Sequence, residues 1–324
     1  MGGSTSLLDD IEQAAAEYQP MLGTDGATAD INMLHMGLFY HFINKTSRTL
    51  LPGELAEIYC RSAANCAIAH SYLMHTILAV TASHIGTLRS GKSDYYRWLS
   101  TSHQAKALSE VKPVLERVNA ENCLPVLLFA HQVGIQSFHE IFTDKRLKTS
   151  FRDFLSGFVH SIGLMRGTYA VIHPWWSTLI DTEMGRIMAD FQRSHSYHGK
   201  ETITLYNLLS SSNLTEKDNE ICRQSVISLQ RQFDEARDLS DDHLATPSTV
   251  FAWLMTASSE FLALLSNARP EALVILAHYG VVLQLRRRSW VIGEAGRFLV
   301  TSICAYLGNE WQAWLEWPRS QVDC

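Results

Sequence analysis

The stretch HSYLMHTILAVTASHI (residues 70–85) sets the fold class, because its apolar residues recur at helical rather than alternating spacing. Similar spacing returns in ENCLPVLLFA (residues 121–130) and in PEALVILAHYGVVL (residues 270–283). Pro270 and Glu271 suit a helix N-terminus, where a missing N–H costs nothing and negative charge is favoured. Since only eight prolines interrupt 324 residues, the sequence predicts an all-α protein.

The predicted organisation is one large helical domain, residues 29–324, preceded by a partly flexible lead, residues 1–28, with a short helix at residues 7–18. Residues 194–216 and 240–247 are rich in polar residues and are predicted to be the longest loops. About eleven main helices are predicted, at residues 31–45, 52–64, 70–90, 95–117, 123–138, 147–165, 175–194, 217–239, 248–266, 270–285 and 291–307, with a final turn at residues 310–315.

The composition argues against several classes of protein. A net charge of -6 and a pI near 6.1 do not favour direct nucleic-acid binding, which needs clustered Lys and Arg. The N-terminal sequence has no basic segment followed by an apolar run, and no apolar stretch is long enough to span a bilayer. We therefore expect an intracellular protein, without a membrane span, whose six cysteines are reduced thiols.

A series of short motifs resembles the sterol-uptake regulator group of fungal zinc-cluster transcription factors, between about Asn32 and Pro318. Each motif is weak alone, and their order and spacing carry the resemblance. The motifs are MLHMGLFYHF (33–42), HSYLMHTILAVTASHI (70–85), HQAKAL (103–108), ENCLPVLLFA (121–130), GLMRG (163–167), PEALVILAHYGVVL (270–283), Trp290 and WLEWP (314–318).

The resemblance implies a central hydrophobic pocket for a sterol or similar small molecule, and a homodimer is one form that such proteins take. Aromatic and Met residues are the candidates for its lining: Phe39, Phe42, Met74, Trp98, Phe138, Phe158, Met165, Trp253, Phe261, Tyr279 and Trp290. The chain departs from the family in containing no C-x-x-C pair, so a zinc cluster is not expected here. With about thirty residues before the first motif, we expect a free-standing form of the regulatory domain.

The candidate catalytic residues are polar groups in apolar surroundings: His131, Gln136, Arg166 and Tyr169. The sequence lacks the motifs of zinc proteases, terpene cyclases, nucleotide-binding enzymes and serine hydrolases, so no metal and no cofactor are predicted. The histidines at positions 84, 103, 131 and 160 are interpreted as core residues with backbone partners, or alternatively as groups that point into a cavity. Arg286–Arg288 is interpreted as a solvated helix end or a patch for a partner.

Two functions remain open from the sequence. The favoured hypothesis is a cofactor-free cyclase or pericyclase, similar to a Diels–Alderase, that holds a terpenoid or polyketide intermediate of fungal natural-product biosynthesis in a reactive conformation. Such an enzyme is expected in the cytoplasm. The alternative is a sterol-like ligand sensor that regulates transcription through a DNA-binding partner, in the nucleus. In both, the partner molecule is a hydrophobic small molecule.

Overall fold

The computed structural model describes residues 32–144, 150–191, 199–238, 247 and 250–323. Within these ranges the chain forms helices and no strands, which confirms the predicted all-α, single helical domain. The predicted lead and its helix at residues 7–18 lie outside the described residues, as does most of the loop predicted at 240–247. No helix in the described part of the chain combines the length and apolarity that crossing a bilayer requires.

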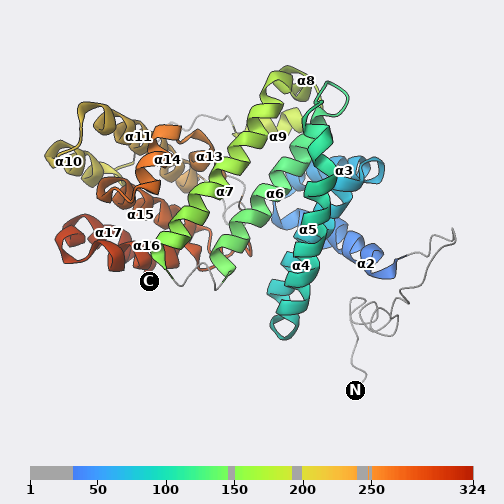
Figure 1. The fold of residues 1–324 in the computed structure, drawn as a ribbon, viewed down its shortest axis with the longest axis horizontal. Coiled ribbons are helices and arrows are strands. Elements are labelled where there is room, and N and C mark those ends of the chain that lie inside the picture. Colours follow the sequence, from blue (N-terminus) through green and yellow to red (C-terminus); the bar gives the residue numbers. More distant parts are fainter. Residues whose placement is uncertain (1–31, 145–149, 192–198, 239–246, 248–249, 324) are drawn as a thin grey trace.

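The N-terminal helices pack around an antiparallel pair. The elements are α2 (Met33–His41), a π-helical turn η1 (Phe42–Thr46), a 3-10 turn η2 (Ser47–Thr49), α3 (Gly53–Ala69), α4 (Ser71–Leu88), the turn η3 (Ser90–Lys92) and α5 (Ser93–Leu115). Helices α4 and α5 run side by side over most of their length (Figure 1). Gly86 allows this approach, because a Cβ there would lie 3.2 Å from Cβ of Tyr96. The pair is therefore closest beside the turn that joins it.

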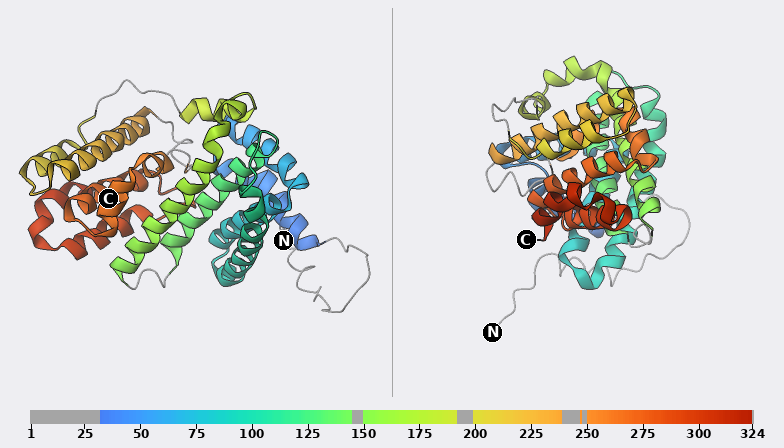
Figure 2. Two further views of the ribbon diagram at one scale, coloured as in Figure 1. Left: turned by 45° about the horizontal axis from the view of Figure 1, so that its top comes forward. Right: turned by 90° about the vertical axis from the view of Figure 1, so that its left-hand side faces the viewer.

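Two long helices, α6 (Cys123–Thr143) and α7 (Phe151–Ile172), cross the middle of the molecule and separate the N-terminal helices from the C-terminal ones (Figures 1 and 2). They are followed by η5 (His173–Trp175), α8 (Trp176–Ile180) and α9 (Met184–Phe191).

The prediction of a single helix at 175–194 is wrong, because α8 ends at Ile180 and α9 begins at Met184. The chain breaks at Thr182, whose Oγ1 donates to the carbonyl of Leu179 at 2.7 Å and accepts from the N–H of Met184 at 3.2 Å.

The C-terminal helices form the other side of the molecule. They are α10 (Ile203–Ser211), α11 (Glu216–Asp238), α13 (Val250–Thr256), α14 (Ser259–Ser266), α15 (Pro270–Leu285), α16 (Ala295–Leu307), the turn η6 (Asn309–Trp311) and α17 (Gln312–Val322). Helix α10 lies inside the loop predicted at 194–216, because Leu205, Leu208 and Leu209 are buried at helical spacing. The helix predicted at 248–266 is divided where Ser258 Oγ caps α14 by accepting from the N–H of Phe261 at 3.0 Å.

Helix α15 is the centre of the C-terminal side, and its bounds match the prediction. Every residue from Glu271 to Gln284 is buried, because α10, α11, α14, α16 and α17 all contact this helix. A helix that is apolar all round requires such an enclosed position. Arg286 just beyond it is also buried, at 1% exposure, while the next two arginines are exposed. The predicted solvated end is therefore wrong for Arg286.

Candidate functional site

Two of the predicted pocket residues, Phe138 and Phe158, meet between α6 and α7, with ring centroids 6.5 Å apart. Both are 1% exposed. Phe142 and Phe154 complete the same aromatic cluster, with centroids 4.9 Å from Phe138 and 5.9 Å from Phe158 respectively. These rings fill the interface between α6 and α7.

Three more predicted pocket residues meet in the C-terminal side. Trp253 stacks on Tyr279 with centroids 4.6 Å apart and meets Phe261 edge-on at 5.7 Å. Their polar atoms bond the backbone: the indole N–H donates to the carbonyl of Ser225 at 3.0 Å, and the phenol donates to that of Val250 at 3.1 Å. This group belongs to the same hydrophobic core as the first, and Phe251 of α13 meets Phe138 with ring centroids 5.1 Å apart.

The remaining apolar candidates are dispersed. Phe42 is fully buried in the main core, and Met165 lies against Gly134, where an added Cβ would be 2.9 Å from its sulfur. Phe39 and Met74 pack on a small second cluster between α2, α4 and α5. Trp98 is 65% exposed and faces solvent. The structure thus groups the predicted pocket residues in several places, and their role as one pocket lining stays a prediction.

The predicted catalytic residues His131 and Tyr169 lie near a buried phenol, Tyr59 of α3. The Nδ1 atom of His131 is 3.0 Å from Tyr59 Oη. Burial lowers the pKa of His131 to about 4 and raises that of Tyr169 to about 12, so both groups are neutral at physiological pH. Arg166, on the same helix as Tyr169, is partly buried. His131 and Tyr169 can thus donate and accept hydrogen bonds, and Arg166 is the charged member of the predicted set.

The fourth candidate, Gln136, belongs to a chain of hydrogen bonds that joins α4, α5 and α6. Its Nε2 donates to Ser100 Oγ at 2.7 Å and to Glu140 Oε1 at 3.1 Å, and Ser100 Oγ lies 2.8 Å from Ser83 Oγ. Gln136 is 0% exposed, and within the described residues its Oε1 has no hydrogen-bond partner. That oxygen is an acceptor available to a hydroxyl or an N–H group.

Trp290, a predicted pocket residue between α15 and α16, belongs to a second set of contacts, which adjoins this chain where Ser83 precedes His84 in α4 and His139 precedes Glu140 in α6. Its ring stacks on His84 with centroids 5.0 Å apart and meets His139 edge-on at 5.1 Å. The indole N–H donates to Thr49 Oγ1 at 2.8 Å, and His84 Nδ1 lies 2.9 Å from Thr46 Oγ1. We call these residues the polar seam: Thr46, Thr49, Ser83, His84, Ser100, Gln136, His139, Glu140 and Trp290.

Burial keeps the two histidines of the polar seam neutral. It lowers the pKa of His84 to about 3 and that of His139 to about 4, and it raises the pKa of Glu140 above its ordinary value. Imidazoles with such low pKa values are poor proton donors near pH 7. The described residues also contain no group of three or more His, Cys, Asp or Glu side chains placed to hold a metal. The polar seam therefore favours hydrogen bonding over proton transfer by its histidines.

Comparison with known proteins connects the chain to one class of regulator. In an alignment 321 positions long that covers 93% of this chain, it is 24% identical to a Zn(2)-C6 fungal-type transcription factor of Gibberella zeae. Over 101 residues, 31% of this chain, it is 27% identical to sterol uptake control protein 2 of Candida albicans. The chain is similar to fungal zinc-cluster transcription factors. No family model matches it. It spans 64% of the length of the first relative and 14% of the second.

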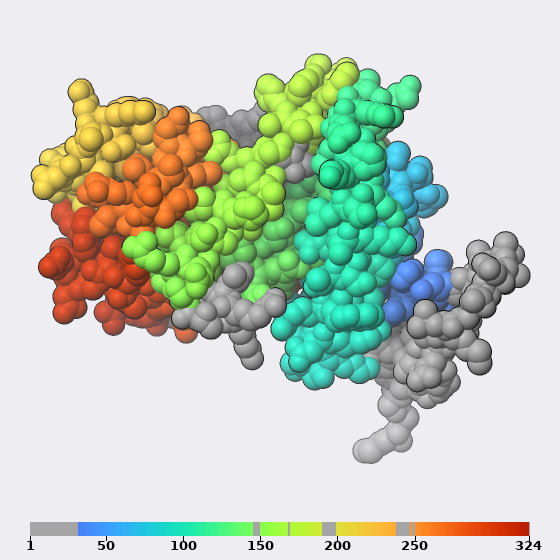
Figure 3. All heavy atoms as spheres, viewed as in Figure 1, coloured from blue at the N-terminus to red at the C-terminus, as the bar shows by residue number. Residues whose placement is uncertain are grey.

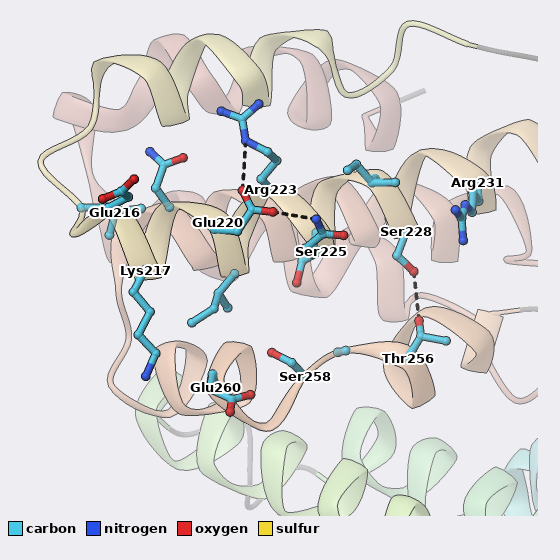
Figure 4. Close-up of a pocket in the computed structure, with 16 residues that line it drawn as sticks. Glu216, Lys217, Glu220, Arg223, Ser225, Ser228, Arg231, Thr256, Ser258 and Glu260 are labelled. Atoms are coloured by element: carbon cyan, nitrogen blue, oxygen red, sulfur yellow. Dashed lines mark hydrogen bonds and ion pairs between the residues drawn. The ribbon is translucent and has the colours of Figure 1, made fainter.

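An open groove, which holds none of the predicted site residues, lies elsewhere on the molecule. It has a volume of about 1240 Å³ and runs between α11 and the turn from α13 to α14. Figure 4 shows Glu220, Arg223 and Arg231 along one wall and Ser258 and Glu260 along the other, with Ser228 bonded to Thr256 across it. Both signs of charge line the groove, so it favours no one class of charged ligand.

The sequence predicted only part of the polar seam. Gln136 and Trp290 were predicted as site residues, whereas the prediction of a backbone partner for three histidines is wrong. His84, His103 and His131 each bond a side chain, and the fourth histidine, His160, is exposed. A signal for the missed residues was present: glutamine and histidine recur at positions 132, 136 and 139 of α6, which is otherwise apolar. That spacing places a polar stripe on one face of a buried helix.

The bond between Trp290 and Thr49 gives a prediction for the polar seam. Trp290→Phe removes the indole N–H and is expected to lower the free energy of unfolding by about 1 kcal/mol, measured by urea denaturation. In a Thr49→Val background the same substitution should cost less, because the acceptor is already gone. Trp98→Phe at the exposed position is the control, and it should change stability by less than about 0.5 kcal/mol. Equal costs in both backgrounds would show that the bond does not form.

Proposed function

We propose that this chain is the regulatory part of a transcription regulator of the zinc-cluster kind, and that it responds to a sterol or another neutral hydrophobic molecule. The observation that carries the proposal is similarity to a Zn(2)-C6 factor along 93% of the chain. The ligand class is inferred from the name of the second relative, a sterol uptake control protein. A regulator of this kind works in the nucleus and acts through a partner that binds DNA.

The chemistry of the polar seam supports the same ligand class. Sterols and terpenoids are large apolar molecules with few hydroxyl groups, and binding sites for such molecules combine apolar walls with a few placed polar atoms. Gln136 of the polar seam offers one such polar atom, because its Oε1 is buried without a donor among the described residues. A hydroxyl group that donates to this oxygen would satisfy it.

The cyclase hypothesis has less support. The relatives named above are regulators, and the neutral histidines of the polar seam do not favour acid–base chemistry. Hydrogen bonding without proton transfer would serve a sensor and a pericyclase equally well. A sensor releases its bound molecule unchanged, whereas a pericyclase releases a new product, and this difference distinguishes the two functions.

The test combines a transcription readout with analysis of the ligand. The full chain is tethered to an unrelated DNA-binding domain in yeast, and we expect reporter activity to change when sterol synthesis is inhibited. Gln136→Leu should weaken the response at equal protein abundance, and Trp98→Phe should preserve it. The purified chain is also incubated with a sterol, which should raise its melting temperature and be recovered unchanged. A reporter indifferent to sterol supply, or a ligand recovered as a new product, would contradict the proposal.

A further inference from the structure

Helix α2 presents a stripe of large apolar side chains to solvent. Met33, Met36, Tyr40 and Ile43 are 56%, 54%, 53% and 38% exposed. Their separations of three, four and three residues place them on one face of the helical segment that α2 and η1 form. Helix α2 lies at the outer edge of the molecule (Figures 1 and 3). We call these four residues the α2 stripe. Exposed apolar side chains that gather in this way mark a surface for binding another element.

Cations lie near both ends of α2. Burial lowers the pKa of His35, and the charge of Lys106 lowers it further, so Lys106 lies close to the start of α2. Burial also lowers the pKa of His41, to about 4, with further lowering by the charges of Lys45 and Arg89, which lie close to the end of α2. An element that binds here must therefore combine an apolar face with negative charge.

The first 31 residues have this charge. They contain six acidic residues and no Lys or Arg: Asp9, Asp10, Glu12, Glu17, Asp25 and Asp30. The whole chain has 33 acidic and 27 basic residues, so residues 32–324 contain 27 of each and have no formal net charge. Residues 32–49, which include the α2 stripe, contain two basic residues and no acidic one. The two neighbouring segments are therefore complementary in charge.

The sequence LLDDIEQAAAEY (residues 7–18) also supplies the apolar face. At helical spacing Leu7, Leu8, Ile11, Ala14, Ala15 and Tyr18 share one side, and acidic residues occupy much of the rest. Twelve helical residues extend roughly 18 Å, and the α2 stripe extends roughly 15 Å. The connection formed by residues 19–31 can reach about 45 Å when extended. That length allows residues 7–18 to fold back along α2.

We propose that residues 7–18 dock as a helix on the α2 stripe of the same chain. Leu8 and Ile11 contact the methionines and Tyr40, and the acidic side chains face the cations at the ends of α2. Docking removes the apolar face of α2 from water and neutralises part of the charge on both segments. The α2 stripe is then an intramolecular surface rather than a site for a second protein.

Hydrogen–deuterium exchange of the full chain tests this arrangement. The amides of residues 7–18 should exchange at least about tenfold more slowly than in an unstructured peptide, which corresponds to about 1.4 kcal/mol of docking. The triple variant Met33→Ser, Met36→Ser, Tyr40→Ser should abolish the protection, as should Leu8→Ser with Ile11→Ser. The matched control, Gln13→Ser with Ala16→Ser, alters the opposite side of the same segment and should retain it. Circular dichroism confirms that each variant keeps its helices.

The alternatives give different results. Exchange of residues 7–18 at the unstructured rate in the parent chain would overturn the proposal. Protection that rises with protein concentration, with a dimer seen by light scattering, would show that a second copy covers the α2 stripe and would also overturn it. Protection that survives the α2 triple variant would show that the segment binds elsewhere. Sterol binding does not enter this experiment, so its outcome is independent of the proposed function.

Discussion

Gly296→Ala is expected to lower the free energy of unfolding by about 3 kcal/mol, one of the largest effects available from a single added methyl group. A Cβ at this position would lie 2.5 Å from the carbonyl oxygen of Gly280 and 2.6 Å from the backbone nitrogen of Gln284. Both atoms belong to the backbone of α15, so no change of side-chain rotamer can relieve the clash. Helices α15 and α16 would have to separate, which exposes the most buried helix of the protein. Urea denaturation measures the loss.

The control for this substitution is Gly163→Ala in α7. Gly163 is also helical, but an added Cβ there would meet no atom within 4 Å. Alanine should therefore stabilise the protein by roughly 0.5–1 kcal/mol through its better helix propensity. If Gly296→Ala lowers the free energy of unfolding and Gly163→Ala raises it, the loss at position 296 comes from the close approach of α15 and α16. A general effect of replacing glycine would change both in the same direction. A cost below about 0.5 kcal/mol for Gly296→Ala would show that the two helices do not pack as described.

Helix positions were predictable where local pattern and burial agree. Helix α15 begins and ends as predicted because Pro270 and Glu271 mark its start and its residues are apolar throughout. Helix α10 was missed because Thr204, Asn207, Ser210 and Ser211 make up much of this short helix, and such residues are also typical of loops. Ser258 was not recognised as a cap because apolar residues continue on both sides of it. For α10 the burial of its leucines decides the structure, whereas the Ser258 cap is a local bond to a residue three positions on.

The candidate site was harder to predict than the fold, because its partners are distant in the sequence. Thr49 and Trp290 are separated by 241 residues, and Gln136 and Ser100 by 36. A single sequence identifies a polar residue in an apolar helix but not the residue that it will meet. Trp98 shows a second limit of prediction from sequence. Its position in the helical pattern of α5 does not reveal that its ring faces solvent. The hydrogen bonds among Ser83, Ser100 and Gln136 depend on how α4, α5 and α6 pack together, and a single sequence does not predict that packing.

The buried histidines predict that the protein unfolds in mild acid. Burial lowers the pKa of six histidines to about 4 or below: His41, His84, His103, His131, His139 and His278. An unfolded histidine has a pKa near 6.5, so between about pH 6.5 and pH 4 the unfolded state binds more protons than the folded state. Their contribution to stability is thus complete above about pH 6.5 and is lost as the pH falls. Each ring costs up to about 3 kcal/mol by pH 4, and a few such rings exceed the stability of a typical domain.

His278 provides the sharpest test of this pH dependence. It is 0% exposed, its Nδ1 lies 2.9 Å from the carbonyl oxygen of Val274, and its ring stacks on Trp317 at 5.2 Å. A second proton on this ring would be buried without water, which is why burial lowers its pKa to about 4. His278→Gln removes the titrating group, so the loss of stability between pH 7 and pH 5.5 should shrink by roughly 1 kcal/mol.

Comparing two pH values cancels the packing cost of His278→Gln, because that cost is the same at both. The exposed His160 supplies the control: His160→Gln should leave the difference between pH 7 and pH 5.5 as it is in the parent chain, since its ring stays in water in both states. Urea denaturation of the three proteins at both pH values gives the comparison. If His278→Gln and His160→Gln change the difference equally, burial of His278 is not the cause. The acid sensitivity would then have to arise at the other buried histidines, such as His103, whose ring lies 4.8 Å from that of His35 and 5.1 Å from that of His75.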